Sequence, residues 1–233
     1  FHPLPYCSTF FIPRPPIARV HTEGYTLQPP TIAGNLIIGL LSFGGFTAVL
    51  SGHLGDRWQR WQPHGRATLA LIGLTVSAPL FAWLYFFPFR NLVLPEPANL
   101  WQLAAAVGAA LLTNEWVILA FVVAFTAVTF QSADPPNWAA MLTDVNLPEH
   151  RGTIIGLSRL FRAVGNALSV WLAGWLFAGL ANHLPAPGHY AVGLAMFQIF
   201  VLPAAVCYLF LRKHIAADRQ NISNILTKRA QHG

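Results

Sequence analysis

The sequence predicts an all-α, polytopic transmembrane helix bundle with five complete spans, and three observations predict it. Apolar residues make up 55% of the 233 residues and charged residues only 9%, whereas soluble globular chains carry roughly 25% charged residues. The mean hydropathy is +0.49. Five apolar stretches are long enough to cross a hydrocarbon core of about 30 Å, which takes roughly 20 helical residues. They lie near 31–53, 66–87, 115–142, 153–180 and 190–212.

The same composition argues against several other classes of protein. The net charge of +6 comes from 14 cations, 12 of them Arg, scattered between apolar blocks, whereas nucleic-acid binding needs a basic stripe. Cys7 and Cys207 stand near opposite ends and define neither a disulfide framework nor a metal site. No nucleophile-elbow, phosphate-loop or HExxH pattern occurs. We therefore expect no enzyme, no cofactor, no metal and no nucleic-acid partner.

Three segments outside the spans complete the predicted organisation. Residues 1–30 contain seven prolines, which disfavour a complete helix. This segment is expected outside the cytoplasm, with the remnant of a preceding helix, in a fragment whose start is missing. Residues 101–112 are Ala-rich, and either extend the third span or lie at the interface. Residues 213–233 form a basic cytoplasmic tail.

The distribution of Lys and Arg predicts the orientation, because positively charged connections stay on the cytoplasmic side. One set of connections carries nine cations and the other carries three. The prediction is a multi-pass cell-membrane protein with a cytoplasmic C-terminus. The larger set is Arg57, Arg60, Arg66, Arg151, Arg212, Lys213, Arg219, Lys228 and Arg229, and the smaller is Arg14, Arg19 and Arg90.

The first connection between spans, residues 52–60, reads GHLGDRWQR. Two glycines beside an acid and two bases predict a tight turn at the cytoplasmic interface, and composition alone allows a simple orientation-setting charge loop. The residues resemble the loop signature G-x-x-x-D-R-x-G-R-[RK] of the major facilitator superfamily. Gln59 replaces a glycine of that pattern and Trp61 a second base. The matching residues, for which the resemblance implies a gating role, are Gly52, Asp56, Arg57 and Arg60.

A second segment, residues 144–153, reads DVNLPEHRGT and opens the fourth span. It is similar to the D-x-x-x-P-E-x-R-G-T entry of the fifth or eleventh helix of the same superfamily. The resemblance places Glu149, Arg151 and Gly152 at the interface and in the same gating group. The resemblance covers residues 31–212. It implies helices two to six or eight to twelve of a twelve-helix transporter, and the missing start and basic tail favour the second half.

Small residues recur four apart in two spans, which predicts close helix approach in lipid. They are Gly44, Ala48 and Gly52 in the first span, and Gly152 with Gly156, then Gly165, Ser169 and Ala173, in the fourth. Polar residues concentrate in the first, third and fourth spans. These three are expected to line an aqueous cavity, while 66–87 and 190–212 face lipid, a division that the resemblance also implies.

The candidate substrate or coupling residues lie inside the third and fourth spans. Arg159, Arg162 and Asn166 share one helical face, and Arg162 lies about 13 Å along the helix from Thr153. A charge at this depth costs about 2.5–3.5 kcal/mol on insertion scales, so a partner anion is expected. Asp134 is the leading partner, in a DPPN sequence with Asn137 where two prolines break the helix. The alternative is that Asp134 only caps the helix segment that follows.

The predicted function is secondary transport of a small solute by alternating access, with the chain supplying one half of the transporter. Proton coupling is a hypothesis that depends on Asp134. The predicted partners are the lipid bilayer, the N-terminal half of the same transporter and the solute. The alternatives are a sensor or scaffold with the same fold and, less favoured, a membrane-embedded enzyme.

Overall fold

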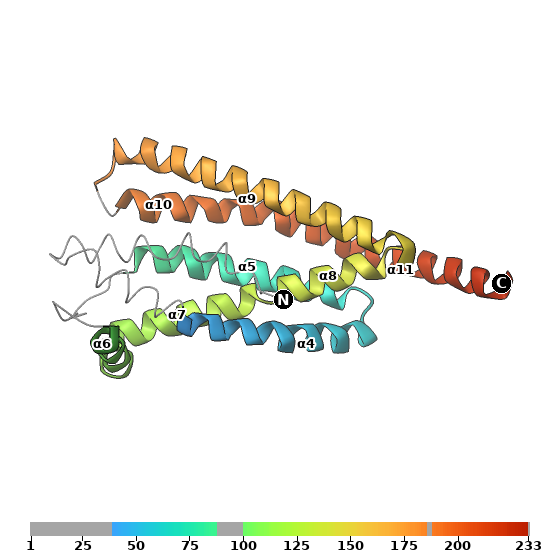
Figure 1. The fold of residues 1–233 in the computed structure, drawn as a ribbon, viewed down its shortest axis with the longest axis horizontal. Helices are drawn as coiled ribbons and strands as arrows, with labels where there is room; N and C mark the ends of the chain where they lie inside the picture. The colour runs from blue at the N-terminus through green and yellow to red at the C-terminus, as the bar shows by residue number, and fades with distance from the viewer. Residues whose placement is uncertain (1–38, 88–99, 186–187, 233) are drawn as a thin grey trace.

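The computed structural model describes residues 39–87, 100–185 and 188–232, and all regular elements in these ranges are helices (Figure 1). Four helical segments are long and apolar enough to cross a membrane, so the chain is a membrane protein. They are Gly65–Phe86, Glu115–Asp144, Pro148–Ala181 and Gly188–Gln231. The individual helices are η1 (Ser42–Phe46), α4 (Thr47–Trp61), α5 (Gly65–Phe86), α6 (Leu100–Thr113), α7 (Glu115–Gln131), α8 (Asp134–Asp144), η2 (Pro148–His150), α9 (Arg151–Ala181), α10 (Gly188–Phe197), η3 (Gln198–Phe200) and α11 (Val201–His232).

The four segments correspond to the predicted spans 66–87, 115–142, 153–180 and 190–212. The predicted span 31–53 begins outside the described residues, and its described part runs through η1 into α4. The predicted segment 1–30 lies outside them as well. Residues 213–232 of the predicted tail belong to α11, which continues as one helix to His232 and projects beyond the other helices (Figure 1).

Helix α5 lies at the centre of the described bundle and packs against α4, α7, α8, α10 and α11. The expectation that this span faces lipid is therefore wrong for the described part of the chain. Small side chains explain its position: Ala67, Ala70 and Ser77 are buried, and a Cβ at Gly73 would lie 2.5 Å from the carbonyl oxygen of Phe130. The prediction considered only the lack of polar residues in this span, whereas close packing in lipid depends on side-chain size.

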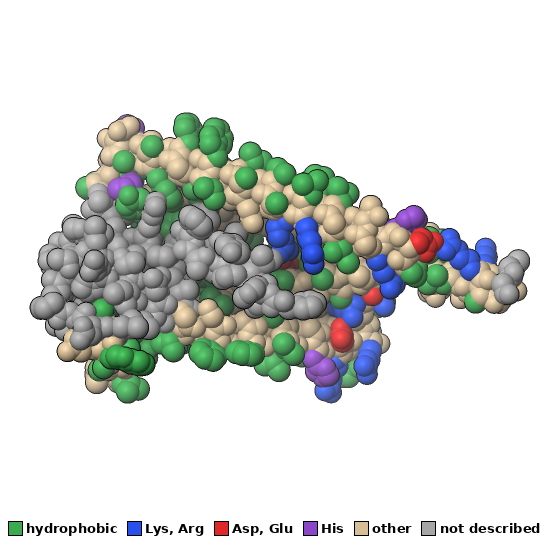
Figure 2. Space-filling model, viewed as in Figure 1, with side chains coloured by type: hydrophobic (Ala, Val, Ile, Leu, Met, Phe, Trp, Pro, Cys, Tyr) green, Lys and Arg blue, Asp and Glu red, His purple; other side chains and the backbone are tan. Residues whose placement is uncertain are grey.

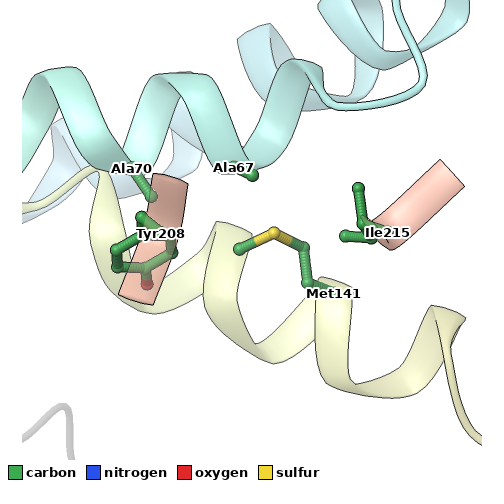
Figure 3. Packing of buried hydrophobic residues seen from close by; sticks show 5 residues of the cluster. All are labelled: Ala67, Ala70, Met141, Tyr208 and Ile215. Carbon is green, nitrogen blue, oxygen red and sulfur yellow. The ribbon is translucent and has the colours of Figure 1, made fainter. Parts of the chain in front are cut away.

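Helices α8 and α11 run toward the same end of the bundle and meet at two polar contacts. The Tyr208 hydroxyl meets Asp134, and Arg219 meets Asp144 at 3.5 Å. Between these contacts, Met141 and Ile215 join a buried apolar cluster with Tyr208, Ala67 and Ala70 (Figure 3). This cluster ties α5, α8 and α11 together, because it buries apolar surface from all three helices.

The predicted turn at residues 52–60 is wrong. All nine residues lie in α4, which continues to Trp61, and the chain turns at Gln62–His64 before α5. Gly65 is the glycine that this turn requires, since a Cβ there would lie 2.7 Å from backbone atoms of Trp58 and Gln59. Gly55 stays helical and faces α8, where the Asn137 side chain occupies the space that a Cβ would need.

Helix α6 is separate from α7 and packs against it. Asn114 divides the two helices and caps α7, its side chain accepting hydrogen bonds from the backbone of Trp116 at 3.0 Å and Val117 at 3.4 Å. Figure 1 shows α6 turned away from the axis that α7 follows. Of the two predicted alternatives for residues 101–112, extension of the third span is therefore wrong.

Helix α9 packs mainly against α10 and α8, and many of its large apolar side chains are exposed. Figure 2 shows apolar side chains along its outer face. Exposure of this kind is what a lipid-facing helix requires. The predicted small-residue face of this helix is packed only in part: Ala173 is buried, whereas nothing lies within 4 Å of a Cβ at Gly152, Gly156 or Gly165. On η1 the prediction is confirmed at Gly44, which contacts Val128 of α7.

Candidate functional site

The candidate site is a group of polar and aromatic residues at mid-depth, here named the mid-depth cluster: Asp134, Trp138, Arg162 and Tyr208. At 1.5 Å per residue, Asp134 precedes Asp144, the last residue of α8, by about 15 Å. Arg162 follows Arg151, the first residue of α9, by about 16 Å, and Tyr208 precedes Arg219 by a similar rise. Three helices therefore place Asp134, Arg162 and Tyr208 at one depth, about 15–16 Å from the end of the bundle where α8 ends, and Trp138 lies one turn nearer that end.

The break between α7 and α8 positions Asp134. Helix α7 ends at Gln131 and α8 begins at Asp134, where Pro135 and Pro136 lack the amide hydrogens that would continue the ladder. The sequence-predicted break is confirmed. Asp134 lies in the first turn of α8, and no side chain caps this helix. The carboxylate instead accepts a hydrogen bond from the Tyr208 hydroxyl, so the capping alternative does not describe its contact.

Arg162 does not form the predicted ion pair with Asp134. Its guanidinium lies over the ring of Trp138, 5.1 Å from the centroid, and no carboxylate of the described residues lies within 4.0 Å of it. It still interacts electrostatically with both Asp134 and Tyr208. The two predicted residues therefore belong to one cluster, but each has an aromatic residue as its direct partner.

The other three predicted residues are Arg159 and Asn166, which share a face of α9 with Arg162, and Asn137, which lies in the interior. Arg159 and Asn166 lie on the face of α9 that carries Arg162 and are exposed. Asn137 points elsewhere: it is 1% exposed, and its amide donates 2.7 Å to the carbonyl oxygen of Ala133 and 3.5 Å to that of Ser51. Asn137 therefore joins α8 to α4, and does not line the surface that Arg162 lines.

A second polar group gathers at the end of the bundle where α4 and α8 end, here named the charged end. Arg66 of α5 contacts Asp56 of α4 at 2.6 Å and Asp144 of α8 at 2.6 Å. Gln59 donates to the same Asp144 oxygen at 3.1 Å. Together with Arg219 of α11, these residues link four helices. Figure 2 shows Lys and Arg side chains concentrated at this end and along the α11 extension.

The residues predicted to gate have different surroundings. Asp56 belongs to the ion-pair network, and Glu149 pairs with Arg229 of α11 at 2.6 Å. Arg151 donates 3.4 Å to the carbonyl oxygen of Asn146. Arg57, Arg60 and Gly152 are exposed, and the structure gives no ion pair to the two arginines among the residues it describes. Gly52 is half-buried, and a Cβ added there would lie 3.5 Å from the Cβ of Pro136.

Sequence reasoning missed Trp138, Tyr208, Arg66 and Arg219 as members of these two groups. Tyr208 lies in an apolar span, where one tyrosine does not by itself indicate a polar site. Trp138 follows Pro135 and Pro136, and the prolines predicted only a helix break. A helical period could have found Trp138, since it lies four residues after Asp134 and on the same face. Nothing local to α11 indicates that Tyr208 meets Asp134, because that contact depends on how α8 and α11 align.

Within the described ranges, no group of three or more His, Cys, Asp or Glu side chains is arranged to hold a metal ion. No protein-family model matches the chain, and a search of curated proteins finds no similar sequence. The functional interpretation therefore depends on the residues and on their geometry.

Proposed function

We propose that the chain forms one half of a major facilitator superfamily secondary transporter that moves a small solute by alternating access. The observation that carries the proposal is the mid-depth cluster beside a broken helix. Transporters place solute and coupling-ion sites near the midplane, at discontinuous helices, and ionisable residues inside a membrane mark functional sites by default. The likeness of residues 52–60 and 144–153 to superfamily signatures supports the same assignment.

We further propose proton coupling through Asp134. A carboxyl group bound to a tyrosine hydroxyl at mid-depth can take up and release a proton without an ion-pair partner to break. Protonation removes a charge that is costly at that depth. This favours a different packing of α8 against α11 in the two protonation states, which is the coupling that alternating access requires.

The charged end is proposed to face the cytoplasm and to hold this side of the bundle closed. Arg66 joins three helices there, and Asp56 pairs with Arg66 instead of lying near the mid-depth cluster. Asp56 should therefore affect the rate of conformational exchange more than solute affinity. The other wall of the solute pathway comes from the N-terminal half of the transporter.

The test is uptake by the full-length protein in proteoliposomes, screened with a panel of radiolabelled solutes under an imposed pH gradient. The wild type should accumulate at least one solute above its equilibrium level. Asp134→Asn should abolish gradient-driven accumulation and retain downhill exchange, because the amide keeps the contact with Tyr208 and loses the proton site. Asp134→Glu should retain some accumulation.

Asp218→Asn on the exposed part of α11 is the matched control, since it also replaces a carboxylate by an amide and should transport like the wild type. Absence of flux for the whole panel, in a folded protein, would favour the sensor or scaffold alternative. Gradient-driven accumulation by Asp134→Asn equal to the wild type would reject proton coupling through this residue.

A further inference from the structure

We propose that Arg159 and Arg162 bind the anionic group of the transported solute, and that this solute is a small organic monoanion such as a carboxylate. The inference rests on the proposed transport function and adds the chemical class of the solute. It starts from the two-sided character of α9.

Helix α9 has one polar face and one apolar face. At 100° per residue, Arg159, Arg162 and Asn166 lie within about 60° of one another. Arg162 is turned toward α8, because its guanidinium lies over Trp138. The opposite side carries exposed apolar residues, which is the arrangement of a helix between lipid and the bundle interior. These are Leu157, Leu160, Phe161, Val164, Leu168, Trp171 and Trp175.

The contact with Trp138 leaves the hydrogen-bonding edge of Arg162 available. The attraction of a cation to an aromatic ring uses no N–H hydrogen bond, and a guanidinium carries five N–H donors in one plane. The structure gives Arg162 no hydrogen bond or ion pair among the described residues, and gives none to Arg159. Trp138 therefore orients a donor fork that fits the two oxygens of a carboxylate.

The net charge of Arg159, Arg162 and Asp134 favours a solute with a single negative charge. Two arginines and Asp134 leave one uncompensated positive charge, and the Asp134 carboxylate already has Tyr208 as its partner. An unpaired cation at this depth is costly, and a single negative charge placed between Arg159 and Arg162 removes that cost. A neutral or cationic solute would leave it in place.

Arg159 lies about one turn closer to the charged end than Arg162. The two guanidinium groups therefore present a pair of cations along the helix axis, with Asp134 and Tyr208 on the neighbouring helices. A carboxylate between the arginines would place the remainder of the solute toward the other half of the transporter. Substitutions in α9 should accordingly alter affinity for the anionic group and not for the body of the solute.

The experiment measures the unfolding midpoint Tm of the full-length protein in detergent without added lipid. The probes are acetate, benzoate and 2-naphthoate, each compared with its uncharged amide. At least one carboxylate should raise Tm in a saturable manner, and its amide should not. Arg159→Gln and Arg162→Gln should raise the half-saturating concentration about tenfold or more, which corresponds to the loss of a charge-assisted contact.

Arg212→Gln is the matched control, because it removes an exposed arginine of α11 and should bind like the wild type. If Arg162→Gln is not recovered folded, Arg162→Lys replaces it: the ammonium keeps the charge and loses the planar fork, so carboxylate affinity should still fall. Carboxylate binding by Arg162→Lys equal to the wild type would overturn the assigned fork.

The inference is overturned if no carboxylate raises Tm, if the amides act equally, if Arg212→Gln loses as much affinity, or if phosphatidylglycerol alone gives the arginine-dependent shift. The last would assign the arginines to a lipid headgroup. Uptake of a neutral or cationic solute that tolerates both Gln variants would overturn this inference and leave transport standing. Arginine-dependent carboxylate binding without any carboxylate flux would leave the anion site standing and reject the transport function.

Discussion

Asn137 shows how one buried side chain restricts a neighbouring helix at a single position. Its amide nitrogen is held by two backbone carbonyl groups, those of Ala133 and Ser51, while Oδ1 is buried against Gly55 without a hydrogen-bond partner among the described residues. The side chain cannot move away without giving up those contacts. Glycine at position 55 is therefore required by packing and not by a turn.

Gly55→Ala should lower the stability of the protein by about 1–3 kcal/mol, because the added methyl group would overlap Asn137 Oδ1 and overpack the α4–α8 contact. Thermal unfolding in detergent measures the effect. Gly52→Ala is the matched control: its Cβ would meet Pro136 at an ordinary 3.5 Å, and alanine favours the helix. The double variant Gly55→Ala, Asn137→Ala should recover part of the loss. Equal stability of the two single Ala variants would contradict this packing.

Residue types in the sequence predicted which side chains at depth need partners, but not which partners they take. The cost of burying Asp134 and Arg162 follows from the bilayer, and the prolines predicted the break between α7 and α8. The direct contacts with Tyr208 and Trp138 depend on the alignment of α8 with α11 and with α9. That alignment comes from packing over the whole bundle, which no local pattern encodes.

Among the helices, the position of α5 depends most on its small residues, and that of α4 depends on contacts along its whole length. Two glycines suggested a turn at residues 52–60, yet both remain helical, because α4 packs lengthwise on α5 and α8. Sequence reasoning succeeded for the long apolar segments, where the bilayer sets the length. It failed for α4 and for the position of α5, where packing between helices decides.

Arg66→Gln should destabilise the charged end by about 1–3 kcal/mol, because it removes two ion pairs at once and leaves Asp144 only partly compensated. The Arg66 side chain is 16% exposed, so water screens these pairs less than surface pairs. Arg219→Gln should cost less than about 1 kcal/mol, since its contact is longer and more exposed. Thermal unfolding at low and high salt measures both.

The difference between Arg66→Gln and the wild type should narrow as salt rises, because the Asp56 end of the network is open to solvent. Arg57→Gln is the matched control, because it removes one positive charge from the same end. It should unfold at the same temperature as the wild type. Losses of equal size in Arg66→Gln and Arg57→Gln would show that net charge, and not the network between helices, sets the stability.

At the scale of the whole molecule, the charges lie at one end and the apolar surfaces along the sides (Figure 2). The composition alone predicted a membrane protein, and the four long apolar helices agree. No helix in the described part of the chain covers the exposed polar face of α9. The proposed half-transporter would account for this, because its partner half would cover that face and complete the solute pathway.

The charge distribution also predicts which end of the bundle enters the cytoplasm. The charged end and the α11 extension carry most of the described cations, including Arg66, Arg151, Arg219 and Arg229, and positive segments stay inside. In a background with both native cysteines replaced by serine, Gln231→Cys should react with an impermeant maleimide only after the cells are permeabilised. His183→Cys, in the connection between α9 and α10 at the opposite end, should react in intact cells. Labelling of Gln231→Cys in intact cells, together with protection of His183→Cys, would reverse the proposed orientation.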